Sequence, residues 1–328
     1  MKTTKRLLLG TATYLAMALY AGVTAAAGLN VASDPVIFGG LTTADTEESP
    51  VCFDQATGQL GQCGGSGGIY PANIIWVAQS GGDYSDLRDA LASITDADTN
   101  NRYLIRVAPG VYELGSTPLQ LESFVDIEGS GMHQTILHGE VGTDTNIWTG
   151  MLLGANDTVL KALTLKNDCN HKHCTAMYNQ GVSPTTIGVK IVVTNQAGSV
   201  TDGVHNAYNA SPAFKDTIIE VGGSTGGSQG IYSYSNCEVS ILRSKITANG
   251  AGTNEGVHNH HASSVIEHST IKASTNTVVN NNTTAEARIF ASRLAGGAVA
   301  YIAGALIDSF SCAAVADENN TVTSDTCQ

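Results

Sequence analysis

The apolar positions near residue 90 follow a helical period. The segment GGDYSDLRDALASI places four apolar residues on one face of a helix over 85–95, and Ser85 is the expected N-cap. These four residues are Leu87, Ala90, Leu91 and Ile94. The following segment, RYLIRVAPGVYEL, alternates instead, with Ile105 and Val107 on one face. Period-2 alternation that ends in a Pro-Gly turn predicts a β-strand.

From residue 175 onward, the chain repeats short strand-like phrases. The phrases that align are TAMYNQG (175–181), DGVHNAY (202–208), QGIYSYS (229–235), EGVHNHH (255–261), NTVVNNN (276–282) and GAVAYIA (297–303). Their offsets are 27, 27, 26, 21 and 21 residues. A second set of phrases keeps the same register, and its apolar anchors are expected to form one buried column. These anchors are Val192, Ile219, Ile246, Ile271 and Leu294.

A repeat of this length without a long helix cannot bury a core of its own. Stacked repeats can do so, because each rung bonds to the next at about 4.8 Å and the aliphatic residues form continuous columns. We therefore predict an all-β fold, a single-stranded right-handed parallel β-helix of nine or ten rungs between residues 103 and 312. The helix at 85–95 is expected to cap its first rung, since an open solenoid end exposes a strand edge.

One outward-facing column of this β-helix is expected to consist of aromatic and histidine rings. In each phrase the aliphatic residue should point inward and its successor outward, which selects Tyr178, His205, Tyr232 and His258. Rings about 5 Å apart can stack. Such a stack can simply stabilise the solenoid, or it can form a flat strip that contacts sugar rings.

Polar residues before the repeated glycines are weaker candidates for chemistry. Asp202 and Glu255 should lie two rungs apart, about 9.6 Å, close to the separation of the carboxylates in inverting glycosidases. Carboxylates beside glycine at turns are also common for backbone reasons. The histidines of HNHH (258–261) and of CNHKHC (169–174) could bind a metal, but solvent-facing histidines and a Cys169–Cys174 disulfide are the simpler interpretations. No phosphate-binding glycine loop is present, so the sequence indicates no cofactor.

The opening of the repeat region resembles a known family. The residues IWVAQSGGDYSDLRDALASI and YLIRVAPGVYEL are similar to the start of pectin methylesterases and of the wider pectin-lyase-like β-helix superfamily. The GVHN and GIYS rungs resemble exported bacterial right-handed β-helix proteins. The resemblance covers about residues 70–312 and implies the fold. The segments that supply the catalytic aspartates, oxyanion donors and arginine of the esterases have no counterpart here, so esterase activity is not expected.

The N-terminal 68 residues precede the predicted β-helix domain at 69–328. A basic start, an apolar run and an Ala-x-Ala pattern indicate a signal peptide at 1–27, which predicts a secreted or cell-surface protein of bacterial type. Residues 28–68 form an extension with a glycine-rich linker, and oligomerisation through 28–63 is one possible role. Export permits disulfides, and the closely spaced cysteines suggest three. The expected pairs are Cys52–Cys63, Cys169–Cys174 and Cys312–Cys327, which leaves Cys237 as a buried thiol or an intermolecular contact.

Charge narrows the choice of partners. The net charge of −13 argues against nucleic acid, which needs a basic surface. After the signal peptide, no run of eighteen apolar residues remains, so no membrane span is expected in the mature chain. The sequence favours a non-catalytic module that binds a polysaccharide or cell-surface glycan, or that serves in adhesion or surface assembly. A carbohydrate-active enzyme, namely a lyase, hydrolase or divergent esterase, is the alternative, and a purely structural stalk is a third possibility.

Overall fold

The computed structural model describes residues 51–54, 59–62, 73–145, 148–196, 198–223, 225–301 and 306–309. The chain divides into two units, Met1–Tyr70 and Pro71–Gln328. In the first unit, β1 (Val51–Asp54) and β2 (Gln59–Gln62) pair in antiparallel fashion. The predicted signal peptide lies outside the described ranges, as do Cys63 of the predicted pair Cys52–Cys63 and both residues of the predicted pair Cys312–Cys327.

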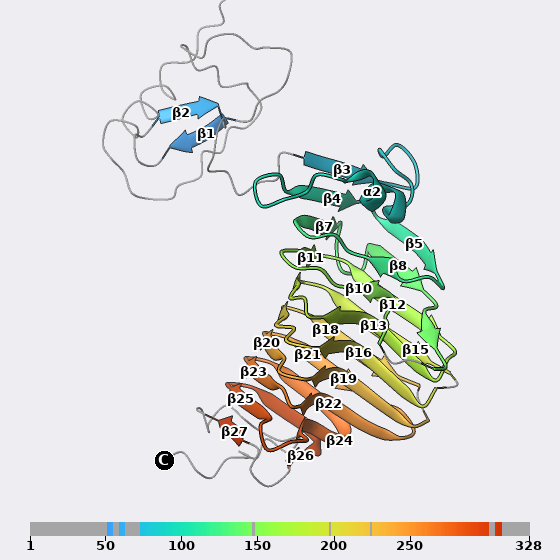
Figure 1. The fold of residues 1–328 in the computed structure, drawn as a ribbon, viewed down its shortest axis with the longest axis vertical. Helices are drawn as coiled ribbons and strands as arrows, with labels where there is room; N and C mark the ends of the chain where they lie inside the picture. The colour runs from blue at the N-terminus through green and yellow to red at the C-terminus, as the bar shows by residue number, and fades with distance from the viewer. Residues whose placement is uncertain are drawn as a thin grey trace, which may run out of the picture. The chain divides into compact units, whose positions relative to one another are not determined.

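The second unit is a right-handed parallel β-helix, as the sequence predicts (Figure 1). Its first face is a sheet of ten parallel strands, and nine of them lie between Tyr103 and Ser309, in agreement with the expected nine or ten rungs. The strands of this face are β3 (Asn73–Val77), β4 (Tyr103–Val107), β7 (Val125–Gly129), β11 (Val159–Lys161), β14 (Thr185–Ile187), β17 (Ala213–Lys215), β20 (Glu238–Leu242), β23 (Ser263–Glu267), β25 (Glu286–Phe290) and β27 (Leu306–Ser309).

Two further faces complete each rung. The second face contains β5 (Gly110–Gly115), β8 (Thr135–Gly139), β12 (Thr164–Cys169), β15 (Lys190–Asn195), β18 (Ile218–Gly222) and β21 (Lys245–Ala248). The third face contains β6 (Leu119–Gln120), β10 (Leu152–Leu153), β13 (His173–Gln180), β16 (Val200–Ala207), β19 (Gly227–Tyr234) and β22 (Thr253–His260). The long strands β24 (Thr270–Asn280) and β26 (Arg293–Tyr301) run through both faces and join them into one sheet, and the short strand β9 (Gly142–Thr143) pairs antiparallel with β13.

The repeat register predicted from the sequence is confirmed on the third face. Tyr178 lies opposite His205, His205 opposite Tyr232, and Tyr232 opposite His258. The last two phrases continue the column with Val279 and Ala300. The repeated phrases therefore occupy the same place in successive rungs, with parallel pairing between every adjacent pair.

The buried column of the second face is confirmed except at one position. The prediction for Val192 is wrong, because this residue lies opposite Glu220 and is partly exposed. Its neighbour Ile191 lies opposite Ile219 and is fully buried. In a strand, a shift of one residue transfers a side chain to the other face. The observed column consists of Tyr112, Leu137, Leu165, Ile191, Ile219, Ile246, Ile271 and Leu294.

The repeated glycine is required by close packing between the second and third faces. A Cβ atom on Gly230 would lie 2.2 Å from Cγ2 of Ile246, and one on Gly256 would lie 2.2 Å from Cγ2 of Ile271. The corresponding distance at Gly203 is 2.5 Å to Cγ2 of Ile219. The isoleucine column therefore leaves no room for a side chain at this position of the phrase, which explains why glycine recurs there.

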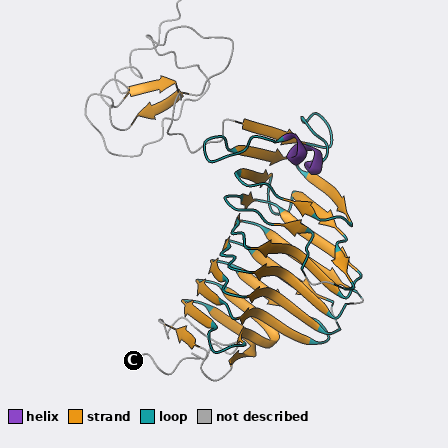
Figure 2. Ribbon diagram, viewed as in Figure 1, coloured by secondary structure: helices purple, strands orange, loops and turns teal. Residues whose placement is uncertain are grey.

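The described residues form one helix, α2 (Leu87–Ser93), at the N-terminal end of the strand stack (Figure 2). The prediction that Ser85 is the N-cap is wrong. Asp86 caps the helix, because its extended backbone lets the carboxylate accept a hydrogen bond of 2.7 Å from the amide of Arg88. The predicted apolar face is confirmed, since its four residues belong to the core of the β-helix. The helix thus covers the first rungs as expected.

Candidate functional site

The third face carries the predicted ring column on its outer side. We call Tyr178, His205, Tyr232 and His258 the inner ring column. Successive ring centroids are 5.4, 4.8 and 5.1 Å apart, and each ring meets the next edge-on. The preceding residues in β16, β19 and β22 are aliphatic and belong to the core, so strand alternation directs these rings outward.

Although it faces outward, the inner ring column is largely buried. His205 is 1 % exposed, Tyr178 4 % and His258 9 %, while Tyr232 is half-buried. These four rings therefore do not form the exposed strip that the sequence suggested. Burial also raises the pKa of Tyr178 to about 12, and burial together with Asp202 raises that of Tyr232 to about 12. Both tyrosines keep their protons at neutral pH and remain hydrogen-bond donors.

A row of polar side chains lies beside the inner ring column on the same face. The acid row consists of Asp202, Gln229 and Glu255, which occupy equivalent positions in adjacent strands. Oδ2 of Asp202 lies 3.1 Å from Nδ1 of His205, and Oε2 of Glu255 lies 2.6 Å from Nδ1 of His258. The two predicted carboxylates are thus two strands apart, and each is paired with the histidine of its own strand.

Gln229 ties the acid row together. Its Nε2 donates to Oε2 of Glu255 at 2.8 Å and lies 3.0 Å from Nδ1 of His258. Burial by itself raises the pKa of Glu255, but the hydrogen bond and charge of His258, with hydrogen bonds from Gln229 and Asn276, outweigh it, so the pKa lies below its usual value. Glu255 is therefore ionised at neutral pH.

Both histidine–carboxylate pairs leave one ring nitrogen without a partner. Nε2 of His205 and Nε2 of His258 are buried and have no hydrogen bond within the described residues, and the same holds for the hydroxyl of Tyr178. An unsatisfied buried polar group costs about 1–3 kcal/mol, so such groups call for a functional or structural reason. A carboxylate that fixes one nitrogen of an imidazole leaves the other available as a proton acceptor or donor.

A second set of rings lies over the inner column and reaches solvent. We call Trp148, Tyr208, Tyr234, His260 and His261 the outer ring cluster. The Trp148 ring centroid lies 5.3 Å from that of His205, 5.7 Å from that of Tyr208 and 5.8 Å from that of Tyr234. Tyr234 contacts His260 at 5.3 Å, and His260 contacts His261 at 5.0 Å. Tyr208 is 42 % exposed, His261 is exposed, and the other three are half-buried.

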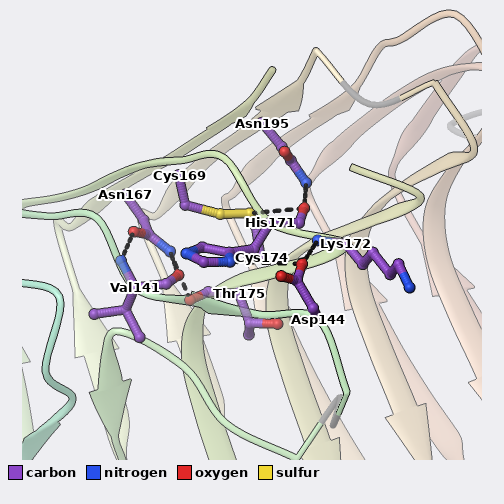
Figure 3. The surroundings of a disulfide bond; sticks show 9 residues. All are labelled: Val141, Asp144, Asn167, Cys169, His171, Lys172, Cys174, Thr175 and Asn195. Carbon is purple, nitrogen blue, oxygen red and sulfur yellow. Dashed lines mark hydrogen bonds and ion pairs between the residues drawn. A yellow bond between two sulfur atoms is a disulfide. The ribbon is translucent and has the colours of Figure 1, made fainter. Parts of the chain in front are cut away.

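A disulfide-bearing turn lies beside residues 141–144, which precede Trp148 in the chain (Figure 3). The predicted Cys169–Cys174 disulfide is confirmed, and it closes the turn between β12 and β13. β9 pairs with the start of β13, and Oδ1 of Asp144 accepts a hydrogen bond of 3.0 Å from the amide of Lys172. Asn167 bonds the backbone of both Val141 and Thr175. These contacts hold residues 141–144, which precede Trp148, beside the start of β13.

The histidine-rich phrases do not converge on a metal site in the described ranges, where no group of three or more potential ligands gathers. His260 is oriented toward the hydroxyl of Tyr232 at 3.5 Å, and His261 contacts the side chain of Asn282 at 3.0 Å. Burial, followed by the charges of His261 and His258, lowers the pKa of His260. Cys237 is a buried free thiol, and burial raises its pKa.

Solved structures with a similar fold include pectin methylesterases. The enzyme from Aspergillus niger in a penultimately deglycosylated form is 13 % identical over 79 % of this chain and 90 % of its own, with a TM-score of 0.53. The deglycosylated form of the same enzyme is 13 % identical over 77 % of this chain and 88 % of its own, with a TM-score of 0.53. Pectin methylesterase PemA from Erwinia chrysanthemi is 12 % identical over 71 % of this chain and 82 % of its own, with a TM-score of 0.43. No protein family and no curated protein matches the sequence. At this level of identity, the likeness establishes the shared β-helix fold.

Sequence reasoning found the inner ring column and the acid row but missed the outer ring cluster. Trp148 lies between β9 and β10, before the first aligned phrase, so no periodic signal connects it with the outer ring cluster. Tyr208, Tyr234 and His261 do lie within or directly after the repeated phrases, and the phrase alignment could have selected them. The roles of Asp202 and Glu255 in catalysis, and of the inner rings in ligand contact, stay predictions.

Proposed function

We propose that this protein is an exported β-helix module that binds a polysaccharide through its outer ring cluster and serves in adhesion or surface assembly. The observation that carries the proposal is the gathering of five partly exposed rings on one side of the third face. Flat rings with polar edges suit sugars, which offer an apolar C–H face and hydroxyl groups at the rim.

The spacing of the rings supports a linear ligand. Tyr208, Tyr234 and His260 belong to three successive rungs, which are about 4.8 Å apart. A chain that crosses the strands therefore meets one ring per rung. A polysaccharide in an extended conformation offers repeated contact faces along such a track, whereas a single small sugar would occupy only part of it.

Several features support an extracellular location. The sequence pattern of residues 1–27 is that of a signal peptide, and the Cys169–Cys174 disulfide is typical of oxidising compartments. Within the described ranges, no helix has both the length and the hydropathy needed to cross a membrane. We place the mature protein outside the cell or on its surface, with residues 28–63 available for assembly.

Binding of the mature chain to a polysaccharide panel tests the proposal. Tyr208→Ala and Tyr234→Ala should each weaken binding by about 1–3 kcal/mol, the range for stacking on an aromatic platform. Trp76→Ala is the matched control, since Trp76 is an exposed aromatic residue (49 %) on β3, outside the cluster. Absence of binding to every polymer, or equal binding by all four proteins, would contradict the proposal.

A carbohydrate-active enzyme is the second candidate, and the two histidine–carboxylate pairs favour it. Each combines an imidazole oriented by a carboxylate with a free Nε2 atom, as a general base requires. If the protein acts on a glycan, incubation with polysaccharides should release products, and His205→Gln should abolish the release while leaving binding in place. Products formed equally by the variant would exclude His205 as the base.

A further inference from the structure

The third face differs from the other two faces in its charge. The strands β13, β16, β19 and β22, and the short turns that follow them, contain no lysine or arginine. Lys172 precedes β13, at the strand end opposite to the outer ring cluster. The first and second faces do carry basic residues, and these form ion pairs such as Lys161–Glu128 on the first face and Lys190–Glu220 on the second.

The third face therefore offers carboxylates but no lysine or arginine to a ligand. Glu255 is ionised because its hydrogen bonds stabilise the carboxylate, and Asp202 lies two rungs away in the same row. Tyr178 and Tyr232 stay protonated, and the lowered pKa of His260 keeps that ring neutral at pH 7. The whole chain adds a net charge of −13. A polyanion that approaches the outer ring cluster finds no lysine or arginine on these strands to pair with, and the chain as a whole repels it.

We propose that the polysaccharide bound by this surface is uncharged and that polyuronates are excluded. This inference rests on the proposed binding function. A carboxylate on a ligand would lose water on contact with the rings and gain no Lys or Arg partner. The surface therefore discriminates against charged polymers by making their binding unfavourable. A neutral pyranose avoids this cost, since its C–H face contacts the rings and its hydroxyls donate to the carboxylates and imidazoles beneath them.

The test compares one polymer with and without charge. Neutral polymers with primary hydroxymethyl groups on the backbone (glucomannan, galactan and mixed-linkage glucan) and acidic ones (polygalacturonate, alginate and hyaluronate) are first screened for binding at pH 7. The best neutral polymer is then oxidised at its primary hydroxymethyl groups, which converts the same backbone into a polyuronate. We expect oxidation to weaken binding at least ten-fold, and added salt to recover part of the loss because it screens the repulsion.

A pair of charge-matched variants assigns the effect to this surface. Thr283 is exposed and follows Asn282, which contacts His261, whereas Thr99 is exposed near the opposite end of the solenoid. Thr283→Lys should strengthen binding of the oxidised polymer several-fold, and Thr99→Lys, with the same change in net charge, should leave it unchanged.

The outcomes separate the two proposals. If neither neutral nor acidic polymers bind, the proposed binding function fails. If a polyuronate or the oxidised polymer binds as tightly as the neutral one, the binding function stands and the inference of an uncharged ligand is overturned. A preference for the neutral polymer that neither salt nor Thr283→Lys changes would also overturn it, because shape and not charge would then set the specificity.

Discussion

The glycine of the repeated phrase has no room for a side chain, and Gly230 shows this most clearly. Gly230→Ala would bring a methyl group to 2.2 Å from Cγ2 of Ile246 and 2.5 Å from the carbonyl oxygen of Gly256. The backbone of the next rung cannot yield easily, so we expect a loss of about 3 kcal/mol or more in the free energy of unfolding, at the upper end of overpacking costs. Urea denaturation followed by circular dichroism measures it.

Gly227 in the same strand provides the control for this substitution. A Cβ atom there would have its nearest neighbour at 3.3 Å, the carbonyl oxygen of Thr253. Gly227→Ala should therefore change the free energy of unfolding by less than about 1 kcal/mol, since strand glycines are also entropically unfavourable. Equal destabilisation by both substitutions would show that the isoleucine column does not explain the repeated glycine.

Glu255 should make stability depend on pH. Its pKa in the folded protein lies below the ordinary value of 4.5, so the stabilisation it provides is present above that value and is lost as the pH falls through the folded pKa. At pH 7, Glu255→Gln should lower the free energy of unfolding by about 1.5–3 kcal/mol, the range for hydrogen bonds to charged groups. The difference between the two proteins should shrink as denaturation is repeated at pH 5, 4 and 3. A difference independent of pH would contradict an ionised Glu255.

Some single residues could be placed from the sequence and others could not. The ring column was predicted because alternation and the repeat phrases determine the direction of its side chains. Val192 was misplaced because Ile191, Val192 and Val193 are all aliphatic, so apolar character alone leaves two registers open. The burial of Tyr178 and His205 was not predictable, since Trp148, which contacts both rings, lies outside the repeat.

At the scale of elements, the turn between β12 and β13 positions the segment that carries Trp148. Replacing Cys169 and Cys174 together by serine removes a crosslink over five residues, which should cost about 2 kcal/mol. The larger effect should be local, because β9 and Asp144 pair with residues within or beside this turn. Trp148 should become more accessible to solvent.

Fluorescence of a single tryptophan can report this change. The chain has 2 tryptophans, so Trp76→Phe leaves Trp148 as the only emitter. In this background, the double serine variant should show red-shifted emission and stronger quenching by acrylamide than the protein with both cysteines. Unchanged emission and quenching would mean that contacts to Tyr178, His205, Tyr208 and Tyr234 hold Trp148 without help from the disulfide.

Elements of the repeat were more predictable than elements outside it. The strands of the third face follow phrases that recur at nearly constant spacing, and each confirms the register of the others. Helix α2 also has an adequate signal in its apolar face, but its N-cap was misassigned by one residue because Ser85 and Asp86 are both favourable capping residues. β9 consists of two residues and exists only through its pairing with β13, so no local pattern could reveal it.

At the scale of the whole molecule, the solenoid should respond to damage according to its position along the stack. Each rung contacts mainly its neighbours, so its stability is a sum of rung and interface terms. Ile246 is fully buried in the middle of the column, and Leu294 lies near its C-terminal end. An aspartate at either position buries an unpaired carboxylate at a cost of several kcal/mol.

Ile246→Asp should therefore abolish cooperative unfolding or cause aggregation, because rungs on both sides lose their partner. Leu294→Asp should unfold only the last rungs, and limited proteolysis should yield a protected fragment that begins before Asn73 and ends before Arg293. Ile74→Asp is the control: this residue is 48 % exposed on β3, and the variant should stay within about 0.5 kcal/mol of the parent protein. Complete unfolding by Leu294→Asp would indicate that the rungs fold as one unit. Folding energy would then be shared across the full stack, and the outer ring cluster could not form on a shortened solenoid.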